Sequence, residues 1–513
     1  YIDGLCNSIQ HSFLLEMGNS KVTKQLLETI KRGRFQNVAR RTIHTVHESS
    51  NSNWRALLEE KLRTKLPRET GTTSIYRVPT SLRQVEPKAY NPSIISIGPY
   101  HHGKHHLKAT EELKQHFFQR LFDPSRQNCE NFEILHHEVR ELEQEARSCY
   151  SENLKFSSDK FIEIMLVDSC FIVELFRELM KNDFRHGSAF IKRWMLPILR
   201  RDLIMLENQI PLFVLCKVFD LTSSTTSTTP NPTFKELALR FFDPLMSRDS
   251  KTLKQSISST VGNSKNHFLD LFRSSILPRI VERGNEPHMF RCMTELREAG
   301  VKIKMGKNCR PLKLSFKKGV LKIPPLYIDD YKGTLFRNMV AFEQCHMTCK
   351  PDITVYLFFL DKLINSAKDL ELLHYEGVIQ HSLGSNKDVA RLVNKLCSEV
   401  PRDVQESYLH KMVWKINCYC NDGLTTKRAR LKHDYFNNPW ASISTLAAIL
   451  LLYLTLLQTA CSFGDAQEYL EDTGFWFSLK DSFYIPFPGL SWSTQTSLIP
   501  EDGFKDYEHI MGI

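Results

Sequence analysis

The sequence lacks the short motifs that identify the most familiar catalytic and secreted proteins. It contains no G-x-S-x-G, no H-E-x-x-H and no kinase signature, so no residue is placed for those chemistries. Its first residues, YIDGLCNSIQHSF, have neither a basic nor an apolar stretch and predict no secretory signal peptide. Pro follows both Asn91 and Asn231, so no Asn-x-Ser/Thr glycosylation site is present. These absences favour a body that stays in the cytosol.

Paired cysteines are missing as well. The 13 cysteines are scattered without any C-x-x-C pair, and Cys170 and Cys216 fall within apolar helical patterns. This usage is typical of free thiols in a reducing compartment. The 68 Lys and Arg residues exceed the 58 Asp and Glu residues by only 10. Nucleic-acid binding requires cations gathered on one face, so we predict no nucleic-acid partner and favour a solvated surface near an anionic membrane leaflet.

Charged side chains disappear completely between Ser442 and Phe463, where the sequence reads SISTLAAILLLYLTLLQTACSF. About 20 apolar residues in a helix span the ~30 Å hydrocarbon core of a bilayer. We therefore predict a transmembrane helix at 442–463 and a single-pass membrane protein. The alternative is a fully buried core helix of a soluble protein, because length alone does not establish insertion.

The charges that flank this run predict its orientation. Positive charge close to a span stays on the cytoplasmic side, whereas acidic residues matter little. After the run, no Lys or Arg occurs before Lys480. We therefore expect a cytoplasmic N-terminal body, an extracytoplasmic tail, and a location in the plasma membrane or an endomembrane. The cations that precede the run are Lys427, Arg428, Arg430 and Lys432.

The composition divides the chain into four parts. Residues 1–50 are polar with little periodicity and predict a flexible N-terminal segment. Residues 51–434 form a helical domain, and its low-complexity stretch 220–233 (DLTSSTTSTTPNPT) predicts an exposed linker. The transmembrane helix and a short tail at 464–513 complete the chain.

Apolar residues recur at helical spacing through the body, so the predicted fold class is mainly α, a large multi-helix body. A small β-hairpin element near 301–323 is the exception, because VKIKM, LKLSF and VLKI are typical of short strands and KKG at 317–319 of a turn. Helices are expected over residues 52–66, 107–123, 129–149, 161–180, 203–219, 234–245, 286–299, 333–346, 352–366, 386–398 and 403–420.

The segment GPYHHGKH (98–105) fits the G-x4-G-K spacing of a phosphate loop. However, His105 stands where the Mg²⁺-binding hydroxyl is required, and Pro99 removes one backbone donor. The helical period also begins only after HHLK, whereas a phosphate loop opens directly into a helix. We therefore predict a surface loop here and no nucleotide cofactor.

Two clusters contain ligand types that metals prefer. Neighbouring histidines occur at 101, 102, 105 and 106, but adjacent histidines seldom point at one ion. On a helix, Cys345, His346 and Cys349 can share a face near Glu343, but no second Cys/His pair completes a four-ligand site. We predict no metal site.

Carboxylates also interrupt the apolar helices. Such groups can be buried and functional, but more often they cap helices or pair with a cation such as Arg177 or Arg201. We therefore predict no catalytic residue. The carboxylates in question are Asp168, Glu174, Asp202 and Glu207.

Several of these segments also form a family pattern, in order and spacing, over roughly residues 54–460. In this pattern of segments, the chain resembles the plant "domain of unknown function 247" family. The matching segments are IYRVPTSLRQVEPKAYNPSIISIGPYHHG (75–103), FIEIMLVDSCFIVELF (161–176), RDLIMLENQIPLFVL (201–215), TELREAGVKIK (294–304), LKIPPLYID (321–329), LFRNMVAFEQC (335–345), ITVYLFFLDKLINSAKDLELLHYEGVI (353–379) and YFNNPWASISTLAAILLLYLTLLQT (435–459).

The resemblance implies a mainly helical cytoplasmic body with one C-terminal membrane span and no established enzymatic activity. Some members in grasses are linked to self-incompatibility loci, which implies a recognition or signalling role. The chain departs from the usual family pattern by continuing through 464–513. The signature residues, expected to be structural, are Arg77, Pro79, Tyr90, Pro92, Gly98, Pro99, Tyr100, His101, Glu207, Asn208, Gln209, Pro211, Asn338, Glu343, Pro439 and Trp440.

Two functional hypotheses follow. The first is a membrane-anchored interaction protein with an unknown protein partner and no identified small-molecule substrate. The second is an enzyme whose site lies where residues 75–106 pack on 161–215. Under the second, the polar groups on offer are Tyr76, Arg77, Tyr90, Tyr100, His101 and His102, facing Glu207 and Asn208. Under the first, Arg77 pairs with a buried carboxylate such as Glu207, and Gly98 and Pro99 set a turn.

Overall fold

The computed structural model divides the chain into two compact units, Tyr1–Thr426 and Lys427–Ile513, which are considered separately. The described residues are 59, 73–122, 131–181, 187–223, 232–246, 248–260, 266–280, 282–285, 290–402, 406–422 and 439–472. The expected flexible segment 1–50 lies outside them, as does the helix expected at 52–66 apart from Glu59.

The first part of the body is helical and is organised around one long buried helix, α8 (Ser158–Met180). Its N-terminus is capped by Ser157, whose hydroxyl accepts from the backbone N–H of Lys160. Helices α5 and α10 pack against it. The elements here are α4 (Thr80–Val85), η1 (Pro87–Tyr90), η2 (His105–Leu107), α5 (Lys108–Leu121), α6 (Asn131–Glu141), α7 (Glu143–Ser148), α8, α9 (Met195–Asp202), α10 (Leu212–Leu221), α11 (Phe234–Phe242), η3 (Asp243–Met246), α12 (Ser250–Thr260) and α13 (Phe268–Ile276).

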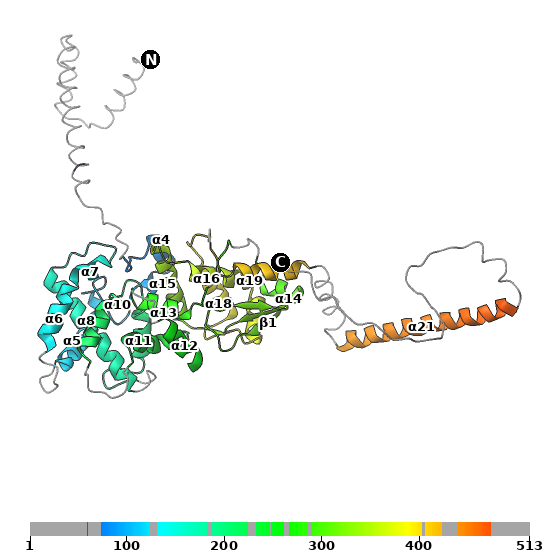
Figure 1. The fold of residues 1–513 in the computed structure, drawn as a ribbon, viewed down its shortest axis with the longest axis horizontal. Helices are drawn as coiled ribbons and strands as arrows, with labels where there is room; N and C mark the ends of the chain where they lie inside the picture. Colours follow the sequence, from blue (N-terminus) through cyan, green and yellow to red (C-terminus); the bar gives the residue numbers. More distant parts are fainter. Residues whose placement is uncertain are drawn as a thin grey trace, which may run out of the picture. The chain divides into compact units, whose positions relative to one another are not determined.

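The second part of the body combines helices with short strands, and α14 (Met293–Glu298) packs beside β1 (Lys302–Met305) (Figure 1). Strands β1 (Lys302–Met305), β2 (Ser315–Lys317) and β3 (Val320–Ile323) form a sheet in the order β1-β3-β2. Strands β4 (Leu326–Ile328) and β5 (Ile379–His381) form a separate parallel pair. The helices are α14 (Met293–Glu298), α15 (Lys332–Cys345), α16 (Asp352–Leu363), α17 (Ala367–Tyr375), α18 (Asn386–Leu396) and α19 (His410–Asn421).

The predicted hairpin is confirmed. β2 and β3 are antiparallel, with Lys317 opposite Val320. Lys318 and Gly319 join them with φ values of 50° and 72°. A two-residue turn with two positive φ angles matches the twist of its strands. The sequence did not predict that β1 pairs with β3 in parallel.

The mainly α class is also confirmed, but three helix predictions were wrong in their bounds. The helix expected at 203–219 begins only at Leu212, because 203–211 form turns and an irregular segment whose backbone groups bond to other parts of the body. The helix expected at 286–299 is limited, in the described residues, to Met293–Glu298, and the one expected at 403–420 begins only at His410. Helices α4, α9, α12, α13 and α17, and the strands β4 and β5, were not predicted.

Aromatic side chains fill the centre of the helical core. The ring of Phe176, on α8, lies 4.9 Å from that of Phe241 and 5.6 Å from that of Phe234, between centroids. Phe242 and Phe268 pack at the same place. All five are almost fully buried. Burying one such side chain contributes about 1.5–3 kcal/mol, so this cluster fixes α8, α11 and α13 against one another.

The second unit contains one described helix, α21 (Pro439–Asp472). Residues Ile443–Ala460 are long and apolar enough to cross a membrane, and none of that window is buried. The hydroxyls of Thr455 and Thr459 donate to the carbonyls of Leu451 and Thr455 within the helix. The helix is longer than the predicted 442–463 and includes 464–472 of the expected tail. The rest of that tail lies outside the described residues.

Candidate functional site

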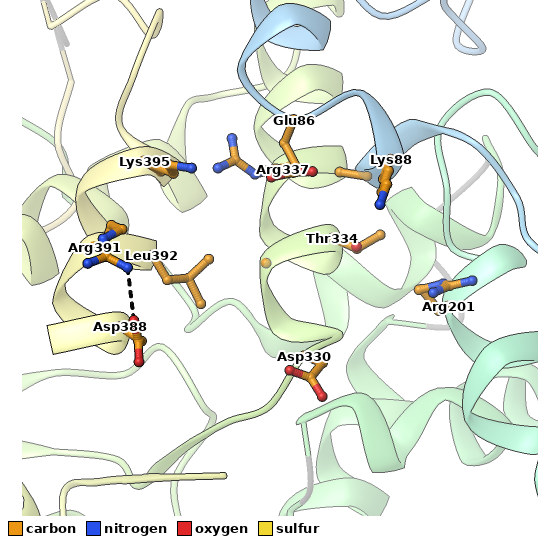
Figure 2. A pocket seen from close by; sticks show the side chains of 12 residues that line it. Glu86, Lys88, Arg201, Asp330, Thr334, Arg337, Asp388, Arg391, Leu392 and Lys395 are labelled. Atoms are coloured by element: carbon orange, nitrogen blue, oxygen red, sulfur yellow. Dashed lines mark hydrogen bonds and ion pairs between the residues drawn. The ribbon is translucent and has the colours of Figure 1, made fainter. Parts of the chain in front are cut away.

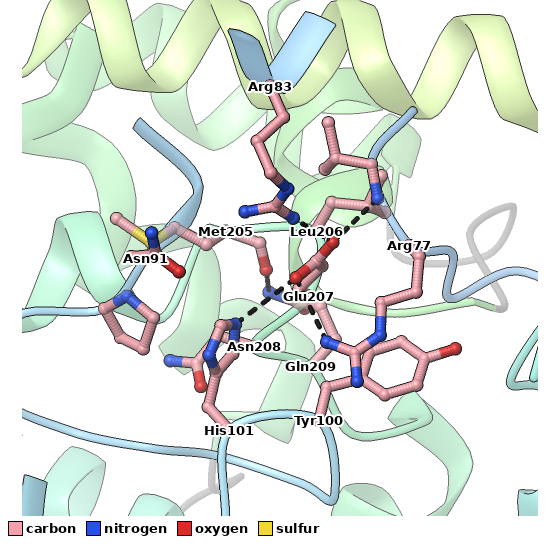
Figure 3. Close-up of polar contacts among 12 residues, drawn as sticks. Arg77, Arg83, Asn91, Tyr100, His101, Met205, Leu206, Glu207, Asn208 and Gln209 are labelled. Atoms are coloured by element: carbon pink, nitrogen blue, oxygen red, sulfur yellow. Dashed lines mark hydrogen bonds and ion pairs between the residues drawn. The ribbon is translucent and has the colours of Figure 1, made fainter. Parts of the chain in front are cut away.

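The Glu207 carboxylate gathers the polar groups of the segment that the sequence singled out. Its Oε1 accepts from the N–H of Val78 at 2.7 Å and from Arg83, and its Oε2 lies 3.3 Å from Arg77 Nη1. The side chain of Glu207 is 2% exposed. Figure 3 shows both arginines directed at this one carboxylate. The expected pairing of Arg77 with Glu207 is therefore present, whereas Arg83 was missed.

His101 lies beside the same carboxylate without a proper hydrogen bond. Its Nε2 is 3.5 Å from Glu207 Oε2, and neither ring nitrogen has a hydrogen-bond partner among the described residues. Burial, with further contributions from Lys104 and the two arginines, lowers the pKa of His101 to about 3. The ring is therefore neutral near pH 7 and forms no ion pair. Arg77 also lies over the ring of Tyr100, 3.9 Å from its centroid.

Asp168 holds the turn that begins the phosphate-loop-like segment. Its Oδ2 accepts from the N–H of Gly98 at 2.8 Å, and its Oδ1 lies 2.7 Å from Nζ of the fully buried Lys114. Burial raises the pKa of Asp168, and Lys114 and the Gly98 N–H oppose that change. A phosphate would need the Gly98 N–H that Asp168 already occupies. The chain after Lys104 also enters η2 before α5 begins at Lys108.

Asp202 and Asn208 bind backbone groups of residues 93–97. Asp202 Oδ2 accepts from the N–H groups of Ser93 and Ile94, each at 2.8 Å. Asn208 Oδ1 accepts from the N–H of Ile97 at 2.6 Å, and its Nδ2 donates to the carbonyl of Ile95. Buried backbone groups need partners, and residues 93–98 obtain theirs from side chains instead of a sheet.

Two amides attach the 203–211 segment to other helices. Gln209 Nε2 donates to the carbonyls of Leu203 and Met205, and its Oε1 accepts from the N–H of Phe268 at the start of α13. Asn338, on α15, accepts from the N–H of Leu206 at 2.9 Å. Asn338 Nδ2 donates to the carbonyls of Ala89 and Thr334.

Glu343 forms a second buried carboxylate centre. Its Oε1 lies 2.6 Å from Arg273 Nη2 and accepts from the N–H of Ile353, and its Oε2 accepts from the N–H and hydroxyl of Thr354. Because these donors occupy the carboxylate, it is not directed toward Cys345 and His346 as a ligand. Among the described residues, no group of three or more His, Cys, Asp or Glu is arranged to hold a metal ion.

The remaining signature residues surround these centres. Tyr90 is buried with Arg83 over its ring, and the carbonyl of Pro92 lies 3.2 Å from His106 Nε2. His101 and His106 thus have separate surroundings and do not form one cluster. Pro79, Pro99, Pro211 and Pro439 stand where α4, the 98–105 segment, α10 and α21 begin, and Trp440 is exposed on α21.

The expected short-range ion pairs are also present. Arg177 Nη1 lies 3.0 Å from Glu174 Oε1, and Arg201 Nη2 lies 2.9 Å from Asp202 Oδ1. Arg201 also lines a cavity of about 400 Å³ that the sequence did not predict (Figure 2). In this cavity, cations and carboxylates alternate. The charged lining residues are Glu86, Lys88, Arg201, Asp330, Arg337, Asp388, Arg391 and Lys395.

The structure defines the class of protein. It is a mainly helical body with buried, hydrogen-bonded carboxylates, together with one apolar helix. The chain belongs to the plant family described as "Plant protein of unknown function" (DUF247), whose model matches residues 75–454. It is 29% identical over 426 residues to the UPF0481 protein At3g47200 of Arabidopsis thaliana, covering 78% of this chain and 87% of that protein. It is 24% identical over 512 residues to the putative UPF0481 protein At3g02645 of the same plant, covering 80% and 95%. No solved structure matches.

Proposed function

We propose that the protein is anchored by α21 in a single-pass arrangement and presents its body as a surface for a protein partner. We infer the anchor from the apolar window Ile443–Ala460, none of which is buried. Apolar side chains exposed around a whole helix are costly in water but favourable in a bilayer. The cations at 427–432 favour a body on the cytoplasmic side of a plasma membrane or endomembrane.

The same proposal assigns a structural role to the signature residues. Glu207, Asp168, Asp202 and Glu343 each accept hydrogen bonds from backbone N–H groups of other segments. Such bonds replace the ladder bonds that an irregular buried segment lacks. On this account the four carboxylates assemble a rigid body, and recognition occurs on its exterior. The finer form of this proposal is a recognition or signalling role like that of the grass self-incompatibility members.

Membrane extraction tests the anchor directly. In carbonate-washed membranes, the wild-type chain is expected to stay in the pellet. A double substitution, L450R with L451R, places two charges in the apolar window at about 2.5–3.5 kcal/mol each and is expected to move the chain to the supernatant. The matched control is E59R, a charge change in the body, which must leave the chain in the pellet. Release of the wild type by carbonate contradicts the anchor.

A second candidate function, binding of a small ligand at the Glu207 centre, rests on one observation. His101 is a buried imidazole whose two ring nitrogens have no hydrogen-bond partner among the described residues. A thermal-shift screen of nucleotides, sugars and divalent metals compares the wild type with H101A. A ligand that raises the melting temperature of the wild type only, with equal unliganded melting temperatures, favours this candidate. If no ligand in the screen raises the melting temperature, the result favours the interaction protein.

A further inference from the structure

A second cavity, remote in sequence from the Glu207 centre, has a different chemistry from the rest of the body. It has a volume of about 640 Å³ and lies among α12, the residues after α13 and the loop between β1 and β2. This volume is in the range of small-molecule sites. We call it the cationic cleft. Its lining residues are Thr252, Lys254, Gln255, Ser258, Ser259, Pro278, Arg279, Asn308, Cys309, Arg310 and Lys313.

The lining contains four cations and no carboxylate. Lys254 comes from α12, Arg279 follows α13, and Arg310 and Lys313 belong to the loop. Within the described part of the chain, none of the four forms an ion pair with an acidic side chain. The cavity of Figure 2, in contrast, places three carboxylates among its five cations. Four unneutralised cations around one cavity create a positive potential that a bound anion would relieve.

Arg310 is the best-fixed member of the cationic cleft. Its Nη1 donates to the carbonyl of Leu277 at 2.5 Å, and its Nη2 donates to the hydroxyl of Ser259. Burial lowers the pKa of Arg310, and the nearby charges of Arg279 and Arg248 lower it further. Two neutral acceptors therefore hold the guanidinium in one place, and the charges close to it are positive. Such a group is suited to an anion, because its planar fork matches phosphate geometry.

Nearby carboxylates do not neutralise the positive charge of the cationic cleft. The Arg248 side chain is 1% exposed, and its Nη2 has no hydrogen-bond partner among the described residues. Its Nε lies 2.8 Å from Asp243 Oδ1, which neutralises that one cation. Asp249 is close enough to affect Cys309, but its oxygens accept from the N–H and hydroxyl of Thr252. Neither carboxylate lines the cavity.

We propose that the cationic cleft binds a phosphate-bearing anion through Arg310, Arg279 and Lys313. Asn308 adds a side-chain amide at the cavity wall, whereas the hydroxyls of Thr252 and Ser258 donate to Asp249 and to the carbonyl of Lys254. A soluble phosphorylated metabolite and a phospholipid headgroup share this chemistry. The cleft does not depend on the anchor, so this inference and the proposed function can fail separately.

The test uses the full chain captured on a sensor by a terminal tag, at 0.15 M salt, in phosphatidylcholine nanodiscs if it stays with carbonate-washed membranes and in buffer alone if it does not. The soluble probe is inositol trisphosphate. The lipid probe is a phosphatidylcholine vesicle with or without phosphatidylinositol bisphosphate. We expect saturable binding of at least one probe. Binding of the soluble probe alone identifies a soluble ligand, and binding that needs the lipid headgroup in a vesicle identifies a membrane lipid.

The variant R279A with K313A removes two exposed cations, so it is expected to fold. It should weaken binding about tenfold or more, because hydrogen bonds from a cation to an anion are stronger than neutral ones. The matched control is R391A with K395A, which removes the same charge from the cavity of Figure 2. Its affinity should change less than about twofold. No saturable binding of either probe, or equal losses in both variants, overturns the proposal.

Discussion

The backbone at Gly98 passes so close to the carbonyl oxygen of Gln209 that a Cβ at position 98 would overlap it. Gly98 also has a φ of +72°, which favours glycine, and its N–H is bound by Asp168. This approach joins the 93–98 segment, the 203–211 segment and α8 at one point. The requirement for glycine here is steric and independent of any ligand.

We therefore predict that G98A destabilises the body by about 2 kcal/mol or more, from the left-handed backbone and the overlap together. Gly103 provides a matched control, because it has a φ of +78° but open space where a Cβ would lie. G103A should cost only the backbone part, about 1 kcal/mol. The measurement is the urea midpoint followed by tryptophan fluorescence. Equal effects of the two substitutions would contradict the close approach.

Removing the Glu343 charge should have a large effect on stability. E343Q leaves Arg273, whose side chain is 7% exposed, without its full counter-charge. Breaking a buried ion pair by neutralising one partner costs about 3–5 kcal/mol. E163Q, in the exposed pair with Lys160, is the control and should cost less than about 1 kcal/mol. If thermal unfolding shows similar melting temperatures for both variants, Glu343 does not hold α16 to α15 as described.

His267 should make the stability depend on pH. Its Nε2 lies 3.0 Å from the carbonyl of Ser74, and its Nδ1 accepts from the N–H of Asp270. Burial lowers the pKa of His267 from 6.5 to about 4. The unfolded chain therefore takes up a proton before the folded one does. The neutral side chain gives its full stabilisation above pH 6.5, and that stabilisation is lost as the pH falls toward 4.

The difference is measured by comparing unfolding midpoints of the wild type and H267Q across this pH range. The wild type should lose about 3 kcal/mol more than the variant between pH 6.5 and 4. H105Q changes an exposed histidine and should follow the wild type. Parallel curves for the wild type and H267Q would show that His267 is not buried in neutral form.

The sequence predicted the helices whose apolar period is long and clear, and the hairpin whose turn residues are diagnostic. It failed at Leu203–Pro211, which is apolar enough to read as helix. Asn208, Gln209 and Asn338 make this segment irregular by binding backbone groups from residues far away in the chain. Only tertiary structure brings those partners together, so periodicity alone cannot detect them.

The candidate site was predictable in part. Arg77 and Glu207 are charged residues of two segments that the sequence placed together, and they do pair. Arg83 and Lys114 were missed because a cation within a helix is ordinarily expected to face solvent, whereas Lys114 lies on the buried face of α5 with Phe117 and Leu121. The cationic cleft was missed because its cations come from three separate elements, each unremarkable by itself.

The most direct test of the anchored arrangement is protease protection in sealed vesicles from cells that express the chain with one tag before residue 73 and another after Ile513. If α21 crosses the membrane, protease added outside cytosol-facing vesicles removes the first tag and leaves the second intact until detergent is added. Removal of both tags without detergent would contradict a membrane-crossing α21, and protection of the first tag would contradict the cytoplasmic body.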